Sequence, residues 1–358
     1  MNPTLRLPPF ATLIVSTDCQ LPHRNNSPNP ASLMNARLPV LMLAACVALS
    51  SFCRADAPVK PLEVRKVFEN GKHNAFTAMR RFKGELWLAF RSGDTHNSAT
   101  ADVLVLRSKD GKEWQQAHTF DVAKDDRDPQ MVVTEQRLYL YCPAMNGTAC
   151  DTWLAYTDDG KTWSTPQKIY EPQFILWKPC IHDGVFYAAA HKKDESSGGK
   201  GREVHFVKSA DGIKWEKVST IRAGNWESET TLFFDAKHHA TAFLRQKYGA
   251  PQAQILEADP PYATWAARPA GVPHFSGHSV HTFRGVTYLL SRSLGPGKTS
   301  GAIIYTFADG KLTPWCELPA GGDCAYLEAV EDGTNMLVSY YSTHEGSTNI
   351  YLATVPLK

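Results

Sequence analysis

A carboxylate and a guanidinium stand near opposite ends of the segment ESETTLFFDAKHHATAFLRQ, residues 227–246. Glu229 lies near its start and Arg245 near its end, and the residues between them alternate between apolar runs and a polar turn. This pattern predicts a β-hairpin, whose two ends return to the same edge of a sheet. We therefore expect Glu229 and Arg245 to face one cavity, where the carboxylate can accept a proton and the guanidinium can bind an anion.

The next hairpin carries an arginine at the equivalent place. The segment TFRGVTYLLSR, residues 282–292, ends in Arg292. Two arginines at matched ends of neighbouring hairpins would converge on one carboxylate and bind it through paired N–H groups. The spacing of Arg245 and Arg292 therefore predicts an anionic ligand.

A tyrosine precedes the last hairpin of the chain, in the segment GGDCAYLEAV, residues 321–330. A phenol has a pKa of about 10, so Tyr326 needs a proton acceptor to act as a nucleophile near neutral pH. A nearby carboxylate can accept the proton, and arginines favour the phenolate. The alternative interpretation is a tyrosine packed in the core.

The elements that position these residues recur along the chain. Three turns, RSKDGKEW (107–114), YTDDGKTW (156–163) and KSADGIKW (208–215), place their glycines 49 and 52 residues apart. Asp-Gly closes a tight turn because glycine accepts a positive φ and the Asp carboxylate bonds to backbone N–H groups that follow it. Weaker copies of the turn follow at residues 259–265 and 309–315.

A second repeat alternates with these turns and predicts the fold. It is a hairpin of apolar, polar and apolar residues, found at 82–90, 133–141, 181–189, 234–243, 283–291 and 330–340. One such hairpin and one Asp-Gly turn in each period of about 50 residues give four antiparallel strands, the blade of a β-propeller. The sequence therefore predicts an all-β, six-bladed propeller over residues 58–358, closed by pairing of strand 63–68 with strand 349–355. A β-sandwich is the alternative, which a fixed period disfavours.

The S-x-D-G-x-x-W turns are similar to Asp boxes, and on a six-bladed propeller they resemble the sialidase (neuraminidase) superfamily, whose members carry BNR repeats. The resemblance covers residues 60–357. It implies an exo-acting glycoside hydrolase whose substrate is a glycan with a terminal acidic or polar sugar, and whose nucleophile is a tyrosine that retains configuration. By this resemblance Tyr326 is the nucleophile, Glu229 accepts its proton, and Arg245 and Arg292 bind the substrate carboxylate.

The chain departs from the sialidase pattern at the first blade. Sialidases carry an arginine on the first inner strand, but the corresponding segment HNAFTAM, residues 73–79, has none. Arg91, at the other end of the same hairpin, is the expected substitute. The loop after Arg91 corresponds to the position of the sialidase acid/base aspartate, and Asp94 is preferred there over Asp102 and His96.

Other polar and aromatic residues stand near the starts of inner strands and are expected to contact the substrate. Arg127 and Asp128, in DDRDPQM, begin the hairpin of the second blade. Trp177, in ILWKPC, begins the third and could form a wall on which a sugar stacks. His96 and Tyr341 are expected to line the same cavity.

Two other functions compete with hydrolysis. A non-catalytic glycan-binding propeller of the same superfamily would explain the missing arginine. A structural propeller that binds protein would not need polar and aromatic groups at the ends of its inner strands. A central cavity lined by Glu229, Arg245, Arg292 and Tyr326 favours an enzyme, whereas an apolar centre favours a scaffold.

The bulk composition argues against several partners. The 358-residue chain has a formal net charge of +2 and no basic run, so we do not expect it to bind nucleic acid. It contains no nucleotide-binding, serine-hydrolase or H-E-x-x-H motif, and none of its cysteines follows C-x-x-C spacing. The sequence therefore predicts neither a cofactor nor a metal centre.

Residues 1–57 are expected to be a targeting segment. The apolar run LPVLMLAACVALSSF, residues 38–52, follows Arg37 and precedes a small-x-small site. This order predicts an export signal that is too short for a membrane span, and a mature chain in the periplasm or outside the cell. A lipid anchor at Cys46 is the alternative.

Export would place the remaining five cysteines in an oxidising compartment. Cys142 and Cys150 have the same short separation as Cys316 and Cys324. Each pair could form a local disulfide, and the alternative is a set of buried free thiols.

Overall fold

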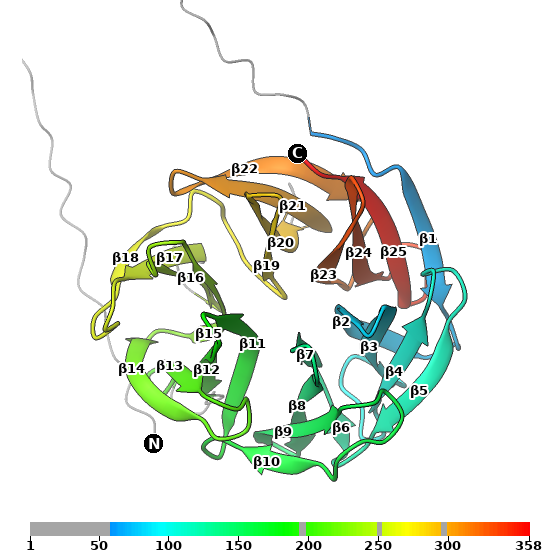
Figure 1. Cartoon of the computed structure of the whole chain (residues 1–358), viewed down its shortest axis with the longest axis horizontal. Coiled ribbons are helices and arrows are strands. Elements are labelled where there is room, and N and C mark those ends of the chain that lie inside the picture. The colour runs from blue at the N-terminus through cyan, green and yellow to red at the C-terminus, as the bar shows by residue number, and fades with distance from the viewer. Residues whose placement is uncertain (1–57, 193–197, 249–252, 295–298) are drawn as a thin grey trace, which may run out of the picture. The chain divides into compact units, whose positions relative to one another are not determined.

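Strands are the only regular elements of the described structure. The computed structural model describes residues 58–192, 198–248, 253–294 and 299–358, which belong to the compact unit Ala55–Lys358. Over these residues it forms strands β1 to β25 and no helix, and the strands group into six sheets around a central axis (Figure 1). The prediction of an all-β, six-bladed propeller is confirmed.

Five blades consist of consecutive strands. The first comprises β2 (His73–Phe82), β3 (Glu85–Gly93), β4 (Asp102–Ser108) and β5 (Gln115–Phe120). The second comprises β6 (Asp125–Asp126), β7 (Gln130–Val133), β8 (Leu138–Asn146), β9 (Ala149–Thr157) and β10 (Gln167–Ile169). The third comprises β11 (Phe174–His182), β12 (Val185–Lys192), β13 (Glu203–Ser209) and β14 (Glu216–Ala223). The fourth comprises β15 (Glu227–Phe234), β16 (Ala240–Gln246), β17 (Ala253–Ala258) and β18 (Ala266–Pro269). The fifth comprises β19 (Ser279–Phe283), β20 (Val286–Leu294), β21 (Ser300–Ala308) and β22 (Lys311–Leu318).

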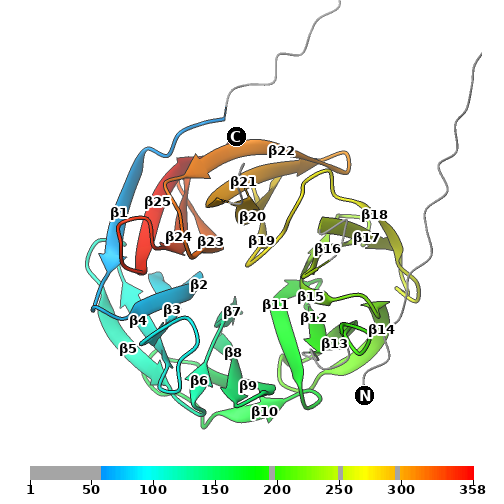
Figure 2. The ribbon, with the colours of Figure 1, turned by 180° about the vertical axis from the view of Figure 1, so that it is seen from behind.

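The sixth blade combines strands from both ends of the unit. It comprises β23 (Cys324–Asp332), β24 (Asn335–Ser342), β25 (Asn349–Pro356) and β1 (Glu63–Phe68). β1 pairs antiparallel with β25, and Glu63 lies opposite Thr354. Backbone hydrogen bonds between the first and last strands therefore close the ring as predicted, with β1 on the outside (Figure 2).

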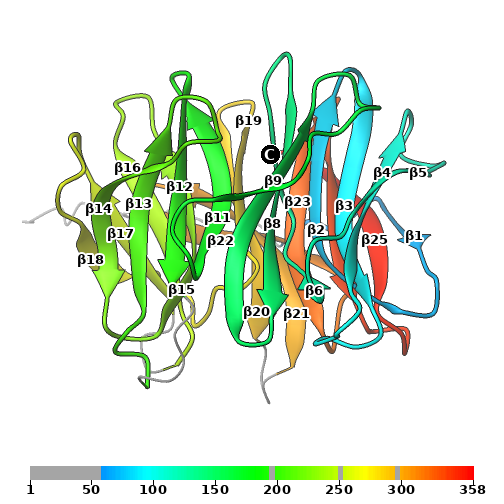
Figure 3. The same cartoon turned by 90° about the horizontal axis from the view of Figure 1, so that it is seen from below.

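The sequence repeats occupy equivalent places in the blades. Each predicted hairpin joins an inner strand to the strand that follows it, which in the second blade means β7 to β8. The three clear Asp-Gly turns join the last two strands of their blades. In the first turn Asp110 Oδ1 accepts the N–H groups of Lys112 and Glu113 at 2.8 and 3.2 Å, and Gly111 has φ +71°. The Asp-Gly turns thus form through the positive φ of glycine and the hydrogen bonds of the Asp carboxylate, as predicted. The hairpin turns and the Asp-Gly turns lie on one face of the ring, because successive strands reverse direction (Figure 3).

The hydrophobic core lies mainly between neighbouring blades. Trp87 of β3, which is 1% exposed, belongs to the same cluster as Leu138 and Leu140 of β8. Burial of such a side chain contributes roughly 1.5–3 kcal/mol. Packing of each blade against the next therefore holds the inner strands in place around the axis.

The inner strands are irregular where they approach the axis. Register shifts interrupt them within residues 75–78, 177–180, 227–230 and 325–328. The φ angles of Phe76, Lys178 and Tyr326 are positive at these breaks, as is that of Asp128 between β6 and β7. A bulge bends a strand and changes the direction of its side chains. These irregularities therefore orient the residues that the next subsection describes.

Five cysteines lie within the described residues, and none forms a disulfide. Cys142 of β8 lies opposite Trp153, and Cys150 of β9 lies opposite Met145, so these two side chains do not face one another. Cys316 and Cys324 belong to strands of different blades. The interpretation as free thiols therefore holds for both pairs.

The predictions for the N-terminal segment concern residues that the structure does not describe. The export signal and Cys46 fall within residues 1–57, outside the described ranges. Among the residues that are described, no helix has the length and apolar character that crossing a membrane requires.

Candidate active site

A polar cavity of about 450 Å³ lies where several inner strands begin. It is lined by His96, Asn97, Arg127, Asp128, Met145, Cys150, Ile175, Trp177, His191, Arg202, Ser228, Glu229, Arg245, Lys247 and Tyr326. Four of these residues carry a positive charge and two carry a carboxyl group, so the lining has an excess of cations. A lining of this kind favours a hydroxylated or anionic ligand.

Tyr326, Glu229 and Arg245 form the centre of this cavity. Tyr326 Oη donates a hydrogen bond to Glu229 Oε1 at 3.0 Å, and Arg245 Nη1 donates to the same oxygen at 2.7 Å. The backbone N–H of Gly277 donates to Glu229 Oε2 at 2.6 Å. The structure thus brings together three residues that are distant in sequence, and their catalytic roles stay predictions.

The pKa values of this group follow from burial and charge. Burial alone would raise the pKa of Glu229, but the Arg245 guanidinium and the Gly277 N–H lower it to about 2. Burial raises the pKa of Tyr326 well above its ordinary value, and Asp128 and Glu229 raise it further. At neutral pH the pair is therefore a neutral phenol that donates to an ionised carboxylate.

The backbone around Tyr326 explains how the ring reaches the axis. Tyr326 has φ +52° at the bulge in β23, and Thr77 Oγ1 donates to its carbonyl oxygen at 2.6 Å. The ring packs against Phe76 and Trp177, with centroids 4.6 and 5.7 Å away. Gly277 has φ +55°, and a Cβ there would collide with the Tyr326 ring. Gly277 is therefore a site residue that the sequence pattern did not predict; a glycine two residues before the inner strand β19 was the available signal.

Arg292 is not among the residues that line the cavity. Its Nε donates to Cys324 O at 2.7 Å, and its Nη2 donates to Tyr341 Oη at 3.1 Å. Tyr341 is likewise outside the lining and donates to Asp323 Oδ1 at 2.8 Å. The expected convergence of Arg245 and Arg292 on one ligand is therefore not visible in this arrangement.

Arg91 does not take the place of the missing first-strand arginine. Its side chain is fully buried, and it donates to Asp125 Oδ1 at 2.7 Å and to Thr95 O at 2.9 Å. Arg127 lines the cavity instead, with its guanidinium 5.1 Å from the centroid of the Phe76 ring. It donates to Asp125 Oδ2 at 3.1 Å, so Asp125 holds both arginines.

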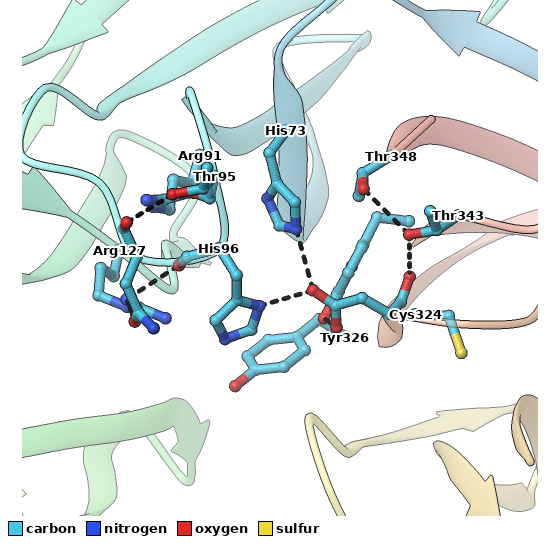
Figure 4. Close-up of polar contacts among 12 residues, drawn as sticks. His73, Arg91, Thr95, His96, Arg127, Cys324, Tyr326, Thr343 and Thr348 are labelled. Carbon is cyan, nitrogen blue, oxygen red and sulfur yellow. Dashed lines mark hydrogen bonds and ion pairs between the residues drawn. The ribbon is translucent and has the colours of Figure 1, made fainter. Parts of the chain in front are cut away.

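The loop between β3 and β4 presents His96, and not Asp94, to the cavity. Asp94 is exposed, accepts a hydrogen bond from Thr100 Oγ1 at 3.1 Å and does not line the cavity. His96 does line it, and its Nδ1 lies 2.6 Å from Asp323 Oδ2 (Figure 4). The position of Asp94 therefore does not support its predicted role as the acid.

Asp128 and Trp177 lie in the wall of the cavity as predicted. Burial raises the pKa of Asp128, and Arg127 opposes that rise. Among the described residues, Trp177 Nε1, Ser228 Oγ and Arg245 Nε are buried atoms without a hydrogen-bond partner. All three can donate hydrogen bonds, so a ligand rich in oxygen atoms would satisfy them.

Two cations of the lining were not predicted. Arg202 precedes β13 and is 3% exposed, and Lys247 follows the end of β16. Arg202 Nη1 donates to Glu227 O at 3.2 Å. Lys247 lies only two residues after Arg245 in the sequence, which was a usable signal, whereas nothing in the local sequence marked Arg202.

Within the described residues, two groups of donors lie close enough together to hold a metal ion. They are His73 with His96 and Asp323, and the more exposed His182 with Asp183 and His238. In the first group, His73 Nε2 and His96 Nδ1 lie 3.0 and 2.6 Å from the same carboxylate oxygen. These are hydrogen-bond lengths, so we interpret the group as two imidazoles that donate to one carboxylate.

Comparison with known proteins agrees with this architecture. The family model described as BNR repeat-like domain matches residues 84–266. A Dyadobacter fermentans protein of unknown function has a similar structure at 19% identity and a TM-score of 0.72, covering 83% of this chain and 99% of that one. No curated protein matches the sequence.

Two enzymes of known activity share the fold at lower identity. Trypanosoma rangeli sialidase in complex with sialic acid is similar at 12% identity with a TM-score of 0.63, over 83% of this chain and 57% of that one. Penicillium chrysogenum α-L-arabinanase complexed with arabinobiose is similar at 12% identity with a TM-score of 0.60, over 83% and 98%. The chain thus spans less than two thirds of the trypanosomal protein. The described propeller and the family match together show that this chain belongs to the BNR repeat-like domain family, with a sialidase-like fold.

Proposed function

We propose that the chain is an exported, sialidase-like exo-glycoside hydrolase that removes a terminal acidic sugar with retention of configuration. The observation that carries this proposal is the contact between Tyr326 Oη and Glu229 Oε1 inside a cavity with an excess of cations. A packed core tyrosine would not need an ionised carboxylate as its hydrogen-bond acceptor.

Tyr326 would attack the anomeric carbon while Glu229 accepts its proton. The low pKa of Glu229 makes it a weak base in the unliganded protein. Arg245 contributes to that low pKa, and it shares Glu229 Oε1 with the phenol. A substrate carboxylate that draws the Arg245 guanidinium toward itself would raise the pKa of Glu229 and thereby activate the tyrosine.

An acidic sugar fits the charges of the lining better than a neutral one. Arg127, Arg202, Arg245 and Lys247 come from three blades and surround the same cavity. The buried donors of Trp177 and Arg245 add directional hydrogen bonds. Charge attraction would concentrate an anionic substrate, and the directed donors would orient it.

The experiment is hydrolysis of a panel of aryl α- and β-glycosides, including sialosides, Kdo-type glycosides and uronides. Wild type is compared with Tyr326→Phe and with the matched control Tyr340→Phe, since Tyr340 Oη also makes one hydrogen bond, to Pro319 O. We expect turnover by wild type and the control and none by Tyr326→Phe. Equal turnover by all three proteins would exclude Tyr326 as the nucleophile.

A non-catalytic glycan-binding propeller is the second function to test. The positions of Arg292 and Arg91 favour it, because both guanidiniums bond to protein groups outside the lining. In that case no substrate of the panel would be hydrolysed, and wild type would bind acidic glycans on an array. Arg245→Ala would then abolish that binding.

Export of the chain is a separate part of the proposal. It derives from the apolar run at 38–52 and is tested by fractionation of cells that express the full chain. Export predicts a shortened protein in the periplasm or medium, and a lipid anchor predicts a membrane-bound form that Cys46→Ala releases. A full-length protein in the cytoplasm would contradict both.

A further inference from the structure

We propose that His96, oriented by Asp323, is the general acid and base of this active site. The inference rests on the proposed function, because it assigns a further catalytic residue to the same hydrolysis. It replaces the expected aspartic acid of the β3–β4 loop with an imidazole from the same loop. Three features of the structure carry it: the position of His96, the surroundings of Asp323 and the proton balance of the reaction.

His96 occupies the rim of the cavity, near the nucleophile. Its side chain is 47% exposed and lines the same cavity as Tyr326. Both rings pack against Phe76, with centroids 5.4 Å from Phe76 to His96 and 4.6 Å from Phe76 to Tyr326. A leaving group departs toward solvent, so the acid that protonates it belongs at such a rim.

Asp323 fixes the orientation of the imidazole. Its Oδ2 lies 2.6 Å from His96 Nδ1 and 3.0 Å from His73 Nε2, while its Oδ1 accepts from Tyr341 Oη at 2.8 Å. Arg292 Nη2 lies 3.4 Å from the same Oδ1. Burial alone would raise the pKa of Asp323, but hydrogen bonds from His73 and His96 lower it far below its ordinary value.

An ionised Asp323 therefore accepts the Nδ1–H of His96 and leaves Nε2 for the substrate. The imidazole has the orienting partner that a catalytic acid and base requires. Besides Asp323 and His73, the charged or titratable groups around it are Arg127, which donates to His96 O at 3.2 Å, and Asp128, whose pKa the His96 charge lowers. Imidazole is the side chain that both gives and takes protons near neutral pH.

The protons balance over the two halves of the reaction. In the first, which begins with His96 as the imidazolium, Tyr326 Oη attacks the anomeric carbon and its proton passes to Glu229. The Nε2–H of His96 protonates the glycosidic oxygen as the C–O bond breaks, and His96 keeps the Nδ1–H that bonds to Asp323. In the second, His96 Nε2 takes a proton from the water that attacks the anomeric carbon. Tyr326 leaves and regains its proton from Glu229, so every group returns to its starting state.

Asp128 is the main competitor for this role. It lines the cavity, and its burial raises its pKa, as an acid near neutral pH requires. Its side chain is only 14% exposed, and within the described structure its Oδ1 is buried without a hydrogen-bond partner. It therefore lacks the rim position of His96. Its Oδ2 lies 3.9 Å from Arg127 Nε, a looser contact than the 2.6 Å between His96 and Asp323, and we assign Asp128 to binding of the sugar.

Leaving-group dependence distinguishes a general acid from a residue that only supports the site. The sugar identified by the panel is offered as its 4-nitrophenyl glycoside, which needs little protonation, and as a disaccharide, which needs full protonation. General acid–base catalysis contributes roughly 10²–10⁴-fold. We expect His96→Asn to lose activity on the disaccharide by about that factor, and on the aryl glycoside by about tenfold or less.

Three further variants complete the experiment. Asp323→Asn should reproduce the leaving-group dependence of His96→Asn with a smaller loss, because it misorients the imidazole without removing it. Asp94→Asn should lose little on either substrate, and Asp128→Asn should lose activity equally on both. Added azide should increase the turnover of the aryl glycoside by His96→Asn, because azide takes the place of the water that His96 activates. Thermal melting of each variant establishes that it is folded.

The outcomes separate the two proposals. Equal losses of His96→Asn on both substrates, or a leaving-group dependence carried by Asp128→Asn or Asp94→Asn, would overturn the role of His96 and leave the hydrolase intact. Absence of turnover by wild type on every substrate would overturn the proposed function, and the acid role would fall with it. Leaving-group dependence confined to His96→Asn and Asp323→Asn supports both.

Discussion

Glu229 and Glu328 are both buried carboxylates on inner strands, yet only Glu229 faces the cavity. Glu328 forms ion pairs with Arg80 and Lys178, and His281 Nε2 lies 3.3 Å from its Oε2. Glu229 has one cationic partner, Arg245, and its Oε1 accepts hydrogen bonds from both that guanidinium and the Tyr326 phenol. A carboxylate surrounded by cations has no capacity left for a substrate, whereas Glu229 can exchange partners when a ligand enters.

The comparison also explains why the axis of the ring is polar. Burial lowers the pKa of Lys178 even though Glu328 raises it, and Arg80 and Lys178 hold the pKa of Glu328 well below its usual range. This group joins blades one, three and six across the axis through charge pairs. We infer that the Glu328 group stabilises the ring and that the Glu229 group acts on the ligand.

The largest expected effect is on the activity of Glu229→Gln. Loss of the proton acceptor should lower kcat/KM by about 10³–10⁴-fold per folded molecule, because the phenol is then a poor nucleophile. The measurement is steady-state hydrolysis of the best substrate of the panel. Glu328→Gln is the matched control and should keep kcat/KM within a few-fold of wild type. A similar loss in both variants would contradict the division of roles.

The next largest effect is on the stability of Glu328→Gln. Removing one partner of a buried charge group leaves the other charges uncompensated, which costs about 3–5 kcal/mol. Denaturant unfolding should show this loss as a lower midpoint with an unchanged slope. A loss below about 1 kcal/mol would mean that solvent stabilises the charges of Arg80 and Lys178 when Glu328 is removed. The ion pairs of Glu328 would then not hold the blades together.

The third effect is a dependence of stability on pH that Glu229 causes. Its pKa is about 2 in the folded chain and 4.5 in the ordinary state, so the ionised form stabilises the fold. That contribution, about 3 kcal/mol, is fully present above pH 4.5 and is lost as the pH falls from 4.5 toward 2. The difference in unfolding free energy between wild type and Glu229→Gln should therefore shrink over this window.

A histidine coupled to Glu229 titrates in the neighbouring pH window. Burial lowers the pKa of His278 to about 4, and the Glu229 charge opposes that fall, so in wild type the contribution of His278 to stability is lost between about pH 6.5 and 4. In Glu229→Gln this phase should move to lower pH, because the charge that favours the imidazolium is gone. A difference between the two proteins that stays constant from pH 6 to pH 3 would show that Glu229 is not ionised more readily in the folded state.

The architecture and part of the site could be predicted because they follow from local patterns. The spacing of the Asp-Gly turns gave the repeat length of the blades. Strand 63–68 was left to pair with the last blade, and it does so. The ends of one hairpin placed Glu229 beside Arg245, and the resemblance to sialidases added Tyr326. These contacts were predictable because a hairpin or a repeated blade determines them.

The remaining contacts depend on irregular backbone, which a repeat does not encode. Arg91 and Arg245 both end second strands, but Arg91 is fully buried against Asp125 and Arg245 lines the cavity. The course of the loop after β3 decides that His96, rather than Asp94, reaches the rim. Bulges in the inner strands set the direction in which the side chains of Lys178 and Tyr326 point. A shift of the strand register by one residue would reverse that direction.

The smallest effect tests the cationic side of the cavity. Lys247→Met removes one charge and keeps most of the apolar stem, so it should raise KM for an acidic substrate several-fold with little change in kcat. Added salt should reduce the difference, because the interaction is a charge attraction close to solvent. Lys208→Met, whose ammonium pairs with Glu216 on an outer part of the third blade, is the control and should leave KM unchanged. A loss in kcat at constant KM would mean instead that Lys247 stabilises the transition state, and that the cations do more than attract the substrate.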